Sequence, residues 1–233
     1  MATKAKGKSK AVRQTKVAHQ SSGEDMYDRL EQRLANSSRS FGDFWKVPEG
    51  KSVIRVIPFQ HDGQSEVFVA ETGHFFAREK KGFSCSGETC PICEWAEDQV
   101  EEVRRNYFPN TKYLANVIVR GGGEGGKDVL VRTRLAKTIV EGIKARKGST
   151  GRPGIMELAK QYKAFHPETG RDFTINRGMD AKGFVEYTVT VSQKPSRVGM
   201  VVKPVDLMNM KRPTLPAQEM ETVIAGLKKK YGR

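Results

Sequence analysis

The sequence predicts a mainly β fold with inserted helices, an α+β arrangement. Three observations support this: short segments rich in β-branched residues, turn signals between these segments, and three cysteines clustered downstream of a histidine. The 23 glycines and 10 prolines supply many turns. Several short strands with one or two helices between them are typical of a small barrel, and an OB-like barrel fits best.

The N-terminal region should lie outside this fold. Residues 1–22 contain almost nothing apolar to bury, which predicts a disordered, flexible basic arm. Residues 23–40 should hold a short amphipathic helix and a serine-rich linker. Three apolar residues share one face of that helix: Met26, Leu30 and Leu34. This face can dock on the protein's own domain or contact a partner, and the residues leave both interpretations open.

Residues 41–210 are expected to form the folded core. The predicted strands, each bounded by turn residues, are 53–59, 67–70, 113–119, 129–135, 172–175 and 185–191. The third and fourth flank a glycine loop and the last two flank 178–183, so each pair predicts a β-hairpin. Apolar spacing predicts helices over 93–105, 138–147, 155–165 and, in a C-terminal helical tail of residues 211–233, over 216–233.

The three cysteines of the chain fall within nine residues, and they predict a metal loop. Cys90 and Cys93 form a Cys-Pro-Ile-Cys knuckle, and Cys85 precedes it. Two thiolates spaced in this way can reach one metal ion, and three sulfurs with one histidine nitrogen make a closed tetrahedral zinc set. His74 is the expected nitrogen ligand, with His61 as the main rival. The ion should be a single structural zinc within a subdomain of about residues 71–106.

An odd number of cysteines in one short segment also argues against disulfides and favours a reducing, intracellular setting. The segment lacks the His-x-Glu that a zinc deaminase places ahead of its Pro-Cys-x-x-Cys. Deaminase chemistry is therefore poorly supported. The N-terminus has no apolar stretch typical of a signal peptide, and no apolar run approaches the roughly 18 residues of a membrane span.

The charge of the chain points to a polyanionic partner. The formal net charge is +14; residues 1–20 contribute +6, and the rest still has 35 basic against 27 acidic residues. The excess is therefore not confined to the arm. Such a surplus indicates nucleic acid first and an anionic membrane second.

One predicted strand carries this charge in an ordered pattern. Arg132 and Arg134 alternate with Val129, Val131 and Leu135, so one face of the strand is basic and the other apolar. Proteins that bind single strands combine basic side chains along the phosphates with aromatic rings under the bases. The candidate nucleic-acid-binding residues are Arg55, Tyr107, Phe108, Tyr113, Arg120, Lys127, Arg132 and Arg134.

The glycine loop at 121–127 is a near-miss to a phosphate-binding P-loop. Its glycines and Lys127 have the right spacing, but Asp128 stands where a P-loop has Ser or Thr. A strand rather than a helix follows it. We therefore interpret the loop as a hairpin tip that can touch a nucleic-acid backbone.

Taken together, these segments resemble the zinc-containing, helix-destabilising single-stranded DNA-binding proteins of T-even-like phages. The matching residues cover about two-thirds of the chain. They are Phe44-Trp45, Gly50–Arg55, Gly73-His74, Cys85, Cys90–Cys93, Gly170–Ile175, Tyr187–Val191 and Lys194–Ser196. The resemblance implies an OB-fold core with a zinc subdomain and supports His74 as the nitrogen ligand. It also implies cooperative binding of single strands through a basic, aromatic-lined cleft during phage replication, recombination and repair.

The chain departs from that family at both ends. The family usually ends in an acidic tail that recruits replication proteins, whereas this chain ends with Lys228, Lys229 and Lys230 before Tyr231. The family's short basic N-terminal motif, which mediates contacts between neighbours on DNA, is matched only loosely by residues 4–16. The spacing from Cys85 to Cys90 is also shorter than expected.

We therefore predict a non-enzymatic protein that coats and protects single-stranded DNA, self-associates along it and contacts replication or recombination proteins. The alternative is a zinc-bearing transcription or anti-termination factor that contacts polymerase and duplex DNA. A nuclease or deaminase accessory fragment is the rival from the enzyme class, but the sequence shows no clustered carboxylates or Ser/His/Asp set near the metal loop.

Overall fold

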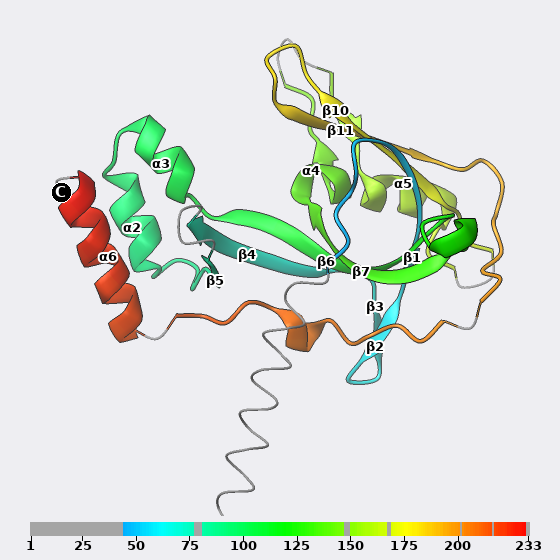
Figure 1. The fold of residues 1–233 in the computed structure, drawn as a ribbon, viewed down its shortest axis with the longest axis horizontal. Coiled ribbons are helices and arrows are strands. Elements are labelled where there is room, and N and C mark those ends of the chain that lie inside the picture. Colours follow the sequence, from blue (N-terminus) through cyan, green and yellow to red (C-terminus); the bar gives the residue numbers. More distant parts are fainter. Residues whose placement is uncertain are drawn as a thin grey trace, which may run out of the picture. The chain divides into compact units, whose positions relative to one another are not determined.

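The structure, a computed structural model, describes residues 44–76, 81–146, 150–166, 169–200, 202–215 and 217–231. The predicted basic arm and amphipathic helix lie outside these residues. The main element is a seven-stranded antiparallel sheet in the order β11-β10-β1-β6-β4-β5, with β7 also paired to β6 (Figure 1). Its strands are β1 (Gly50–Ile57), β4 (Val69–Phe76), β5 (Lys81–Ser84), β6 (Asn110–Val119), β7 (Val129–Ala136), β10 (Phe173–Met179) and β11 (Val185–Val191).

Strand β6 organises the sheet because it pairs with three other strands. One edge of β6 pairs with β7 from Lys112 to Val119. The other edge pairs with β1 through its C-terminal half and with β4 through its N-terminal half. The two predicted hairpins, β6–β7 and β10–β11, are confirmed. The mainly β fold with inserted helices is confirmed as well, but the sheet is open: among the described residues, no ladder joins β11 to β7.

The two faces of the sheet are covered differently. The inner face carries the main core, with Ala115, Val117 and Val119 of β6 packed among Phe173 and Ile175 of β10. Helices α4 (Lys137–Val140) and α5 (Ile155–Tyr162) contribute buried residues to that core. The outer face of β6, which bears Leu114 and Asn116, carries a smaller cluster with Phe59, Val69 and Leu207. Short strands complete the fold: β2 (Phe59–His61) pairs with β3 (Gln64–Glu66), and β8 (Gly142–Ile143) pairs with β9 (Arg152–Pro153).

Two predicted helices differ from those observed. The helix predicted over 138–147 ends after one turn, because Gly142 has a φ of 79° and a Cβ there would lie 2.3 Å from the carbonyl oxygen of Arg152. The helix predicted over 93–105 is two helices, α2 (Pro91–Glu97) and α3 (Glu101–Tyr107). Val100 between them is extended and exposed. The helix predicted over 155–165 and the tail helix are confirmed as α5 and α6 (Ala217–Tyr231).

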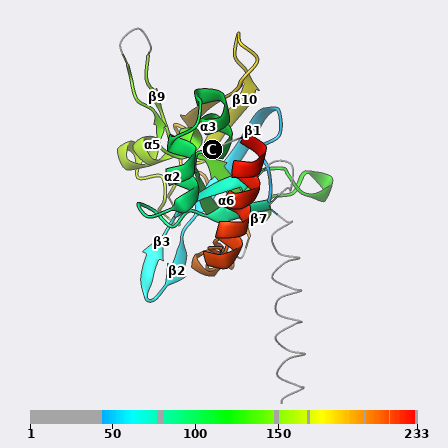
Figure 2. The same ribbon diagram turned by 90° about the vertical axis from the view of Figure 1, so that its left-hand side faces the viewer.

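Helix α6 belongs to a second packing unit, the metal module, which we define as β5, α2, α3 and α6. Figure 2 shows α6 alongside α2, and the two helices share a cluster in which Leu215, Met220 and Leu227 pack with Ile92 and Trp95. The tail predicted from residue 211 onward is thus a packed part of the module. In the described part of the chain, no helix combines the length and the apolar character that a membrane span requires.

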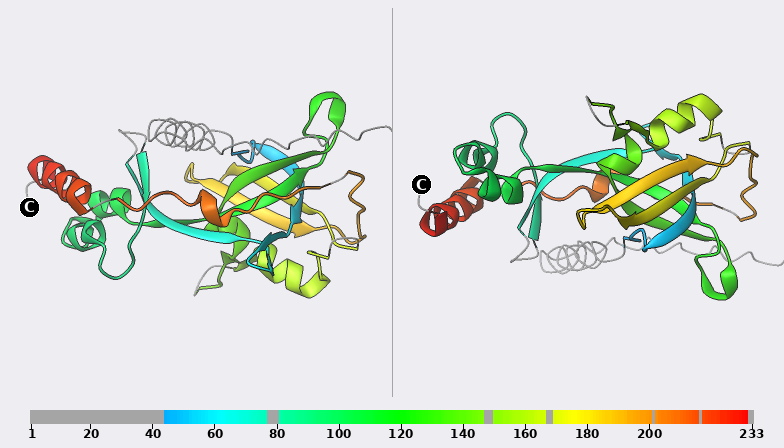
Figure 3. Two further views of the ribbon diagram at one scale, coloured as in Figure 1. Left: turned by 90° about the horizontal axis from the view of Figure 1, so that it is seen from below. Right: turned by 90° about the horizontal axis from the view of Figure 1, so that it is seen from above.

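A strap, residues 202–215, connects the end of the sheet region to α6. Figure 3 shows the 3-10 turn η2 (Met208–Met210) and the flanking strap residues crossing the sheet. The side-chain amide of Asn116 donates to the carbonyl oxygen of Val205 at 2.8 Å and accepts from its N–H at 3.3 Å. Leu207 is fully buried in the outer-face cluster. The strap is therefore fixed to the middle of β6 by both polar and apolar contacts.

Candidate metal centre and nucleic-acid interface

The four predicted metal ligands come together where β4 meets the metal module. The Nε2 atom of His74 and the sulfur atoms of Cys85, Cys90 and Cys93 all lie within 4.8 Å of one another. Nε2 lies 3.2 Å from the Cys90 sulfur and 3.7 Å from the Cys93 sulfur, and the Cys85 and Cys93 sulfurs are 3.6 Å apart. A tetrahedral zinc with Zn–S bonds of about 2.3 Å would place two sulfurs about 3.8 Å apart. The donor set therefore fits one tetrahedral metal ion.

Local structure explains why these residues converge. Pro91 occupies the first turn of α2, where its missing N–H is not needed, so the chain turns into a helix directly after Cys90. Cys93 then lies one turn further on the same helix. His74 reaches the cluster from β4, where it pairs with Phe83 of β5. The rival ligand His61 lies on β2, where its Nδ1 atom is 3.0 Å from a carboxylate oxygen of Asp206.

Burial and neighbouring groups shift the pKa values of Cys90 and Cys93 in opposite directions. Burial alone would raise the pKa of Cys90, but hydrogen bonds from the backbone N–H groups of Cys93 and Ser86 lower it to about 6. Burial raises the pKa of Cys93 strongly, and the neighbouring sulfurs of Cys85 and Cys90 raise it further. Three thiolates at this spacing repel one another, and a divalent cation between them removes that penalty.

A row of basic and aromatic side chains lies on the outer face of the sheet. Paired residues in an antiparallel ladder share a face, so Arg132 and Arg134 lie beside Asn116 and Leu114 on this side. The predicted division of β7 into a basic and an apolar face is thus present. Trp45 bridges to Thr133 of β7, which brings the preceding residue, Phe44, onto the arginines.

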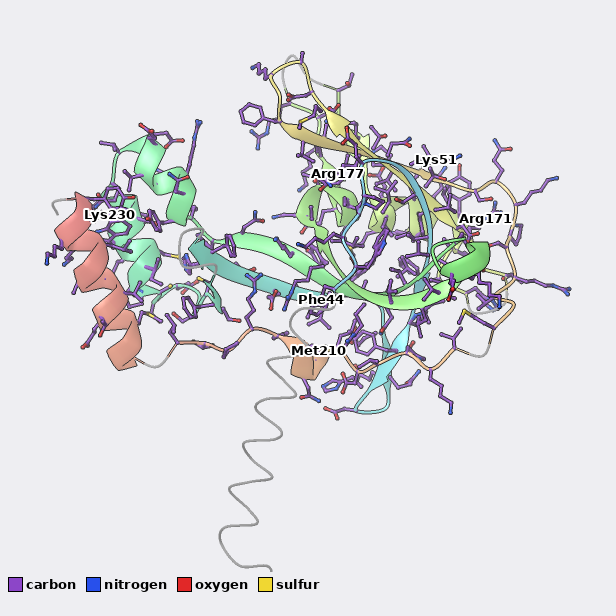
Figure 4. The ribbon with its side chains drawn as sticks, in the orientation of Figure 1. Phe44, Lys51, Arg171, Arg177, Met210 and Lys230 are labelled. Atoms are coloured by element: carbon purple, nitrogen blue, oxygen red, sulfur yellow. The ribbon has the colours of Figure 1, made fainter. Side chains whose placement is uncertain are left out.

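The Phe44 ring stacks with both arginine side chains. The guanidinium carbon of Arg134 lies 4.1 Å from the ring centre and that of Arg132 lies 5.9 Å away, distances typical of cation–π contacts. Figure 4 shows Phe44 beside Met210 of the strap, and the Met210 sulfur accepts a hydrogen bond from Arg132 at 3.7 Å. Phe44 therefore provides an aromatic surface within a basic region.

The row continues along β4 toward the metal module. Glu71, Gly73 and Phe75 share one face of β4, and Glu71 pairs with Lys112, which places all of them on the outer face. Phe75 is 51% exposed. The Arg212 guanidinium packs against Gly82, the cross-strand partner of Phe75. The contact is so close that a Cβ at Gly82 would lie 2.6 Å from an Arg212 nitrogen. Basic side chains from β6, β7 and the strap therefore lie between two aromatic rings, Phe44 and Phe75.

Two other predicted contact residues are engaged within the protein. Arg55 is 1% exposed; it donates to the hydroxyl and the carbonyl oxygen of Ser196 and lies 3.7 Å from Asp172. Arg120 donates to Asp172 at 2.9 Å and pairs with Asp128 at 2.5 Å. These arginines hold the segment after β11 against the sheet, and their contact with nucleic acid stays a prediction.

The four remaining predicted contact residues lie apart from the outer-face row or are engaged in other contacts. Tyr107 packs in the metal module, where its ring makes edge contacts with Trp95 and Tyr231. Phe108 is 40% exposed and lies beneath the Arg104 guanidinium. Tyr113 donates its hydroxyl hydrogen to Glu141; burial and this bond raise the pKa of Tyr113 to about 12.

Lys127 is exposed in the loop between β6 and β7, after the 3-10 turn η1 (Glu124–Gly126). The sequence prediction omitted Glu71, Lys112 and Arg212, and it did not select Phe44 or Phe75 from the aromatic residues that could stack on bases. Alternation along residues 110–114 could have placed Lys112 on the face of Leu114. No local signal marks Arg212, because it reaches the sheet from a segment far away in the sequence.

Comparison with known proteins agrees with these features. Residues 48–231, most of the chain, match the family described as "gp32 DNA binding protein like". The chain therefore belongs to this family, which is defined by DNA binding rather than by a catalysed reaction. A search of curated proteins found no match.

Proposed function

We propose that this protein binds single-stranded DNA cooperatively, coating and protecting it during phage DNA replication, recombination and repair. The observation that supports this best is the outer-face row, in which Arg132, Arg134, Lys112 and Arg212 lie between Phe44 and Phe75. Cations that follow phosphates and rings that stack on bases are the features single-strand binding requires.

The metal has a structural role in this proposal. We propose one zinc ion held by His74, Cys85, Cys90 and Cys93, since three thiolates and one imidazole are typical of closed structural sites. Bound there, the ion would fix the knuckle that leads into α2. We also propose self-association along DNA, contacts with replication or recombination proteins and an intracellular location in the host.

The test compares the affinity for poly(dT) with that for a duplex of equal length across a salt series. Tighter binding to poly(dT), with little sequence preference and a log–log salt slope of roughly 0.7 per phosphate contact, is expected. Replacing Arg132 and Arg134 together by alanine should lower that slope by up to about 1.4. A preference for the duplex would instead favour a zinc-bearing transcription or anti-termination factor.

A further inference from the structure

One buried carboxylate organises the cations of the outer-face row. Glu71 is only 2% exposed, yet it interacts with side chains from two distant segments. Its Oε2 atom accepts a hydrogen bond from Nε of Arg134 at 3.0 Å and lies 3.8 Å from Nε of Arg212. Its Oε1 atom accepts the backbone N–H of Arg212 at 2.6 Å. A single side chain thus fixes both a strand arginine and a strap arginine.

Arg212 is held from the other side as well. Its carbonyl oxygen accepts the hydroxyl hydrogen of Ser84 at 2.5 Å, and its guanidinium lies on the backbone of Gly82. A side chain at Gly82 would occupy that space. The position of Arg212 is therefore determined by β4, β5 and the strap together.

The cluster holds more positive charge than Glu71 can neutralise. Lys112 lies opposite Glu71 on β6, so three cations surround one carboxylate. Burial lowers the pKa of Lys112, and the charges of Arg212, Arg134 and Lys46 lower it further, while Glu71 raises it. Such a surplus, with Arg134 and Arg212 still 13% and 17% exposed, favours an anion at the cluster.

We propose that Arg134, Arg212 and Lys112 form a phosphate-binding subsite for the DNA backbone and that Glu71 is its positioning residue. This inference rests on the proposed single-strand binding. Guanidinium groups bind phosphate best when their N–H donors are held in a fixed geometry. Glu71 supplies that geometry, although its own charge opposes DNA.

The proposal predicts that removing the negative charge of Glu71 weakens DNA binding, whereas charge repulsion alone predicts that it strengthens binding. Removing a carboxylate from a DNA-binding face should ordinarily strengthen binding, because it removes repulsion. Here Glu71→Gln should weaken the binding of labelled oligo(dT) by roughly 5- to 30-fold, since glutamine has one uncharged acceptor oxygen in place of the two carboxylate oxygens that bind Arg134 and Arg212. Gly82→Ala keeps every charge but displaces the Arg212 guanidinium, and it should weaken binding in the same direction.

A comparison of backgrounds separates positioning from a general loss of structure. When Arg134 and Arg212 are both alanine, Glu71→Gln should no longer weaken binding and should leave it equal or tighter. The matched control is Glu186→Gln, which removes the carboxylate of the Arg152–Glu186 pair elsewhere in the sheet and should not weaken binding. Melting temperature and zinc content show whether each variant is folded. If Glu71→Gln does not fold, the result for Gly82→Ala tests whether the position of Arg212 matters for binding.

The failures of the two proposals can be told apart. If the wild-type protein does not bind oligo(dT) in a salt-dependent manner, the proposed function fails. If the wild type binds but Glu71→Gln binds equally well or more tightly, or Gly82→Ala has no effect, the positioning role of Glu71 is overturned while the proposed function stands.

Discussion

The Nδ1 atom of His74 lies 2.8 Å from the carbonyl oxygen of Tyr107, the last residue of α3. A carbonyl oxygen can only accept a hydrogen bond, so Nδ1 carries the proton and Nε2 keeps its lone pair toward the sulfur atoms. The orientation of the imidazole is thus set by the C-terminal end of α3. Metal binding and the docking of α3 on β4 should therefore depend on each other.

Cys90→Ser tests the metal centre. Cys90 is buried, and its loss leaves three ligands, so the variant should retain little zinc and lose more than about 4 kcal/mol of unfolding free energy. Elemental analysis and thermal melting measure both effects, with Thr89→Ala as the control that keeps about one zinc per chain. A wild-type content below about 0.3 zinc per chain, without exposure to chelator, would contradict the assignment.

Leu227→Ala tests whether α6 is an integral part of the metal module. Leu227 is 7% exposed in the cluster with Trp95, and truncating a buried leucine costs about 2–5 kcal/mol. We expect a lower melting temperature, a shift in Trp95 fluorescence and faster loss of zinc to a chelator. An exposed position on the same helix, Lys229→Ala, is the control that truncates a side chain without removing a buried contact. Unchanged zinc release would mean that the module holds its metal without α6.

Phe75→Ala tests base stacking at the end of the row. Stacking on an aromatic ring is worth about 1–3 kcal/mol per base, so affinity for oligo(dT) should fall by roughly 5- to 150-fold while the salt slope stays the same. Anisotropy titrations at several salt concentrations measure both quantities. Phe184→Ala is the matched control, because Phe184 is also exposed, at 68%, but lies at the tip of the β10–β11 hairpin. Equal losses from the two variants would show that Phe75 has no special place in binding.

The sequence predicted the features that depend on neighbouring residues. The cysteine knuckle and the two hairpins are local patterns, so their spacing was enough to locate them. The helix over 138–147 was wrong because Gly142 packs on Arg152 and Gly154, a contact that apolar periodicity does not encode. The break at Val100 was missed for a similar reason, since apolar spacing alone predicts one continuous helix over 93–105.

The candidate interface was predictable only in part. Alternation along β7 placed Arg132 and Arg134 on one face, as the structure also has them. The same reasoning could not show that Arg55 would be buried against Ser196, or that Glu71 would meet Arg212. Both contacts join residues 141 positions apart. The first depends on how the segment after β11 crosses the sheet, and the second depends on how the strap crosses it.

The pair of His61 and Asp206 should make one strap contact sensitive to pH. The hydrogen bond with Asp206 raises the pKa of His61 above 6.5, while the backbone N–H of Met208 and then His61 lower the pKa of Asp206 below 3.8. A raised histidine pKa stabilises the folded state below about pH 6.5, and this contribution is lost as the pH rises through the folded value. The contribution of Asp206 is lost as the pH falls through its own lowered pKa.

NMR titration of the His61 ring measures this effect. In Asp206→Asn, the pKa of His61 should move back toward 6.5, and stability should change less between pH 6 and 8 than in the wild type. An identical His61 titration in the two proteins would show that Asp206 is not its partner in solution.

Deletion of residues 1–20 tests the role of the six positive charges in that segment. Binding to a short oligonucleotide should stay within a few-fold of the wild type, because the proposed interface lies in the sheet. Binding to long poly(dT) should become markedly less cooperative if the segment contacts a neighbouring protein on the DNA. Equal losses on short and long DNA would make it a simple phosphate clamp.

The pairing of α2 with α6 has a consequence for how the protein is made. The segment with the metal ligands leaves the ribosome first, and the helix that covers Trp95 follows about 120 residues later, from Glu97 to Ala217. At about 5–20 residues per second, this delay lasts roughly 6–24 s. During that time the cluster around Trp95 is covered by β5 and α3, through residues such as Phe83 and Tyr107, but not by α6. The nascent protein should thus be most open to aggregation and cysteine oxidation before α6 has emerged from the ribosome.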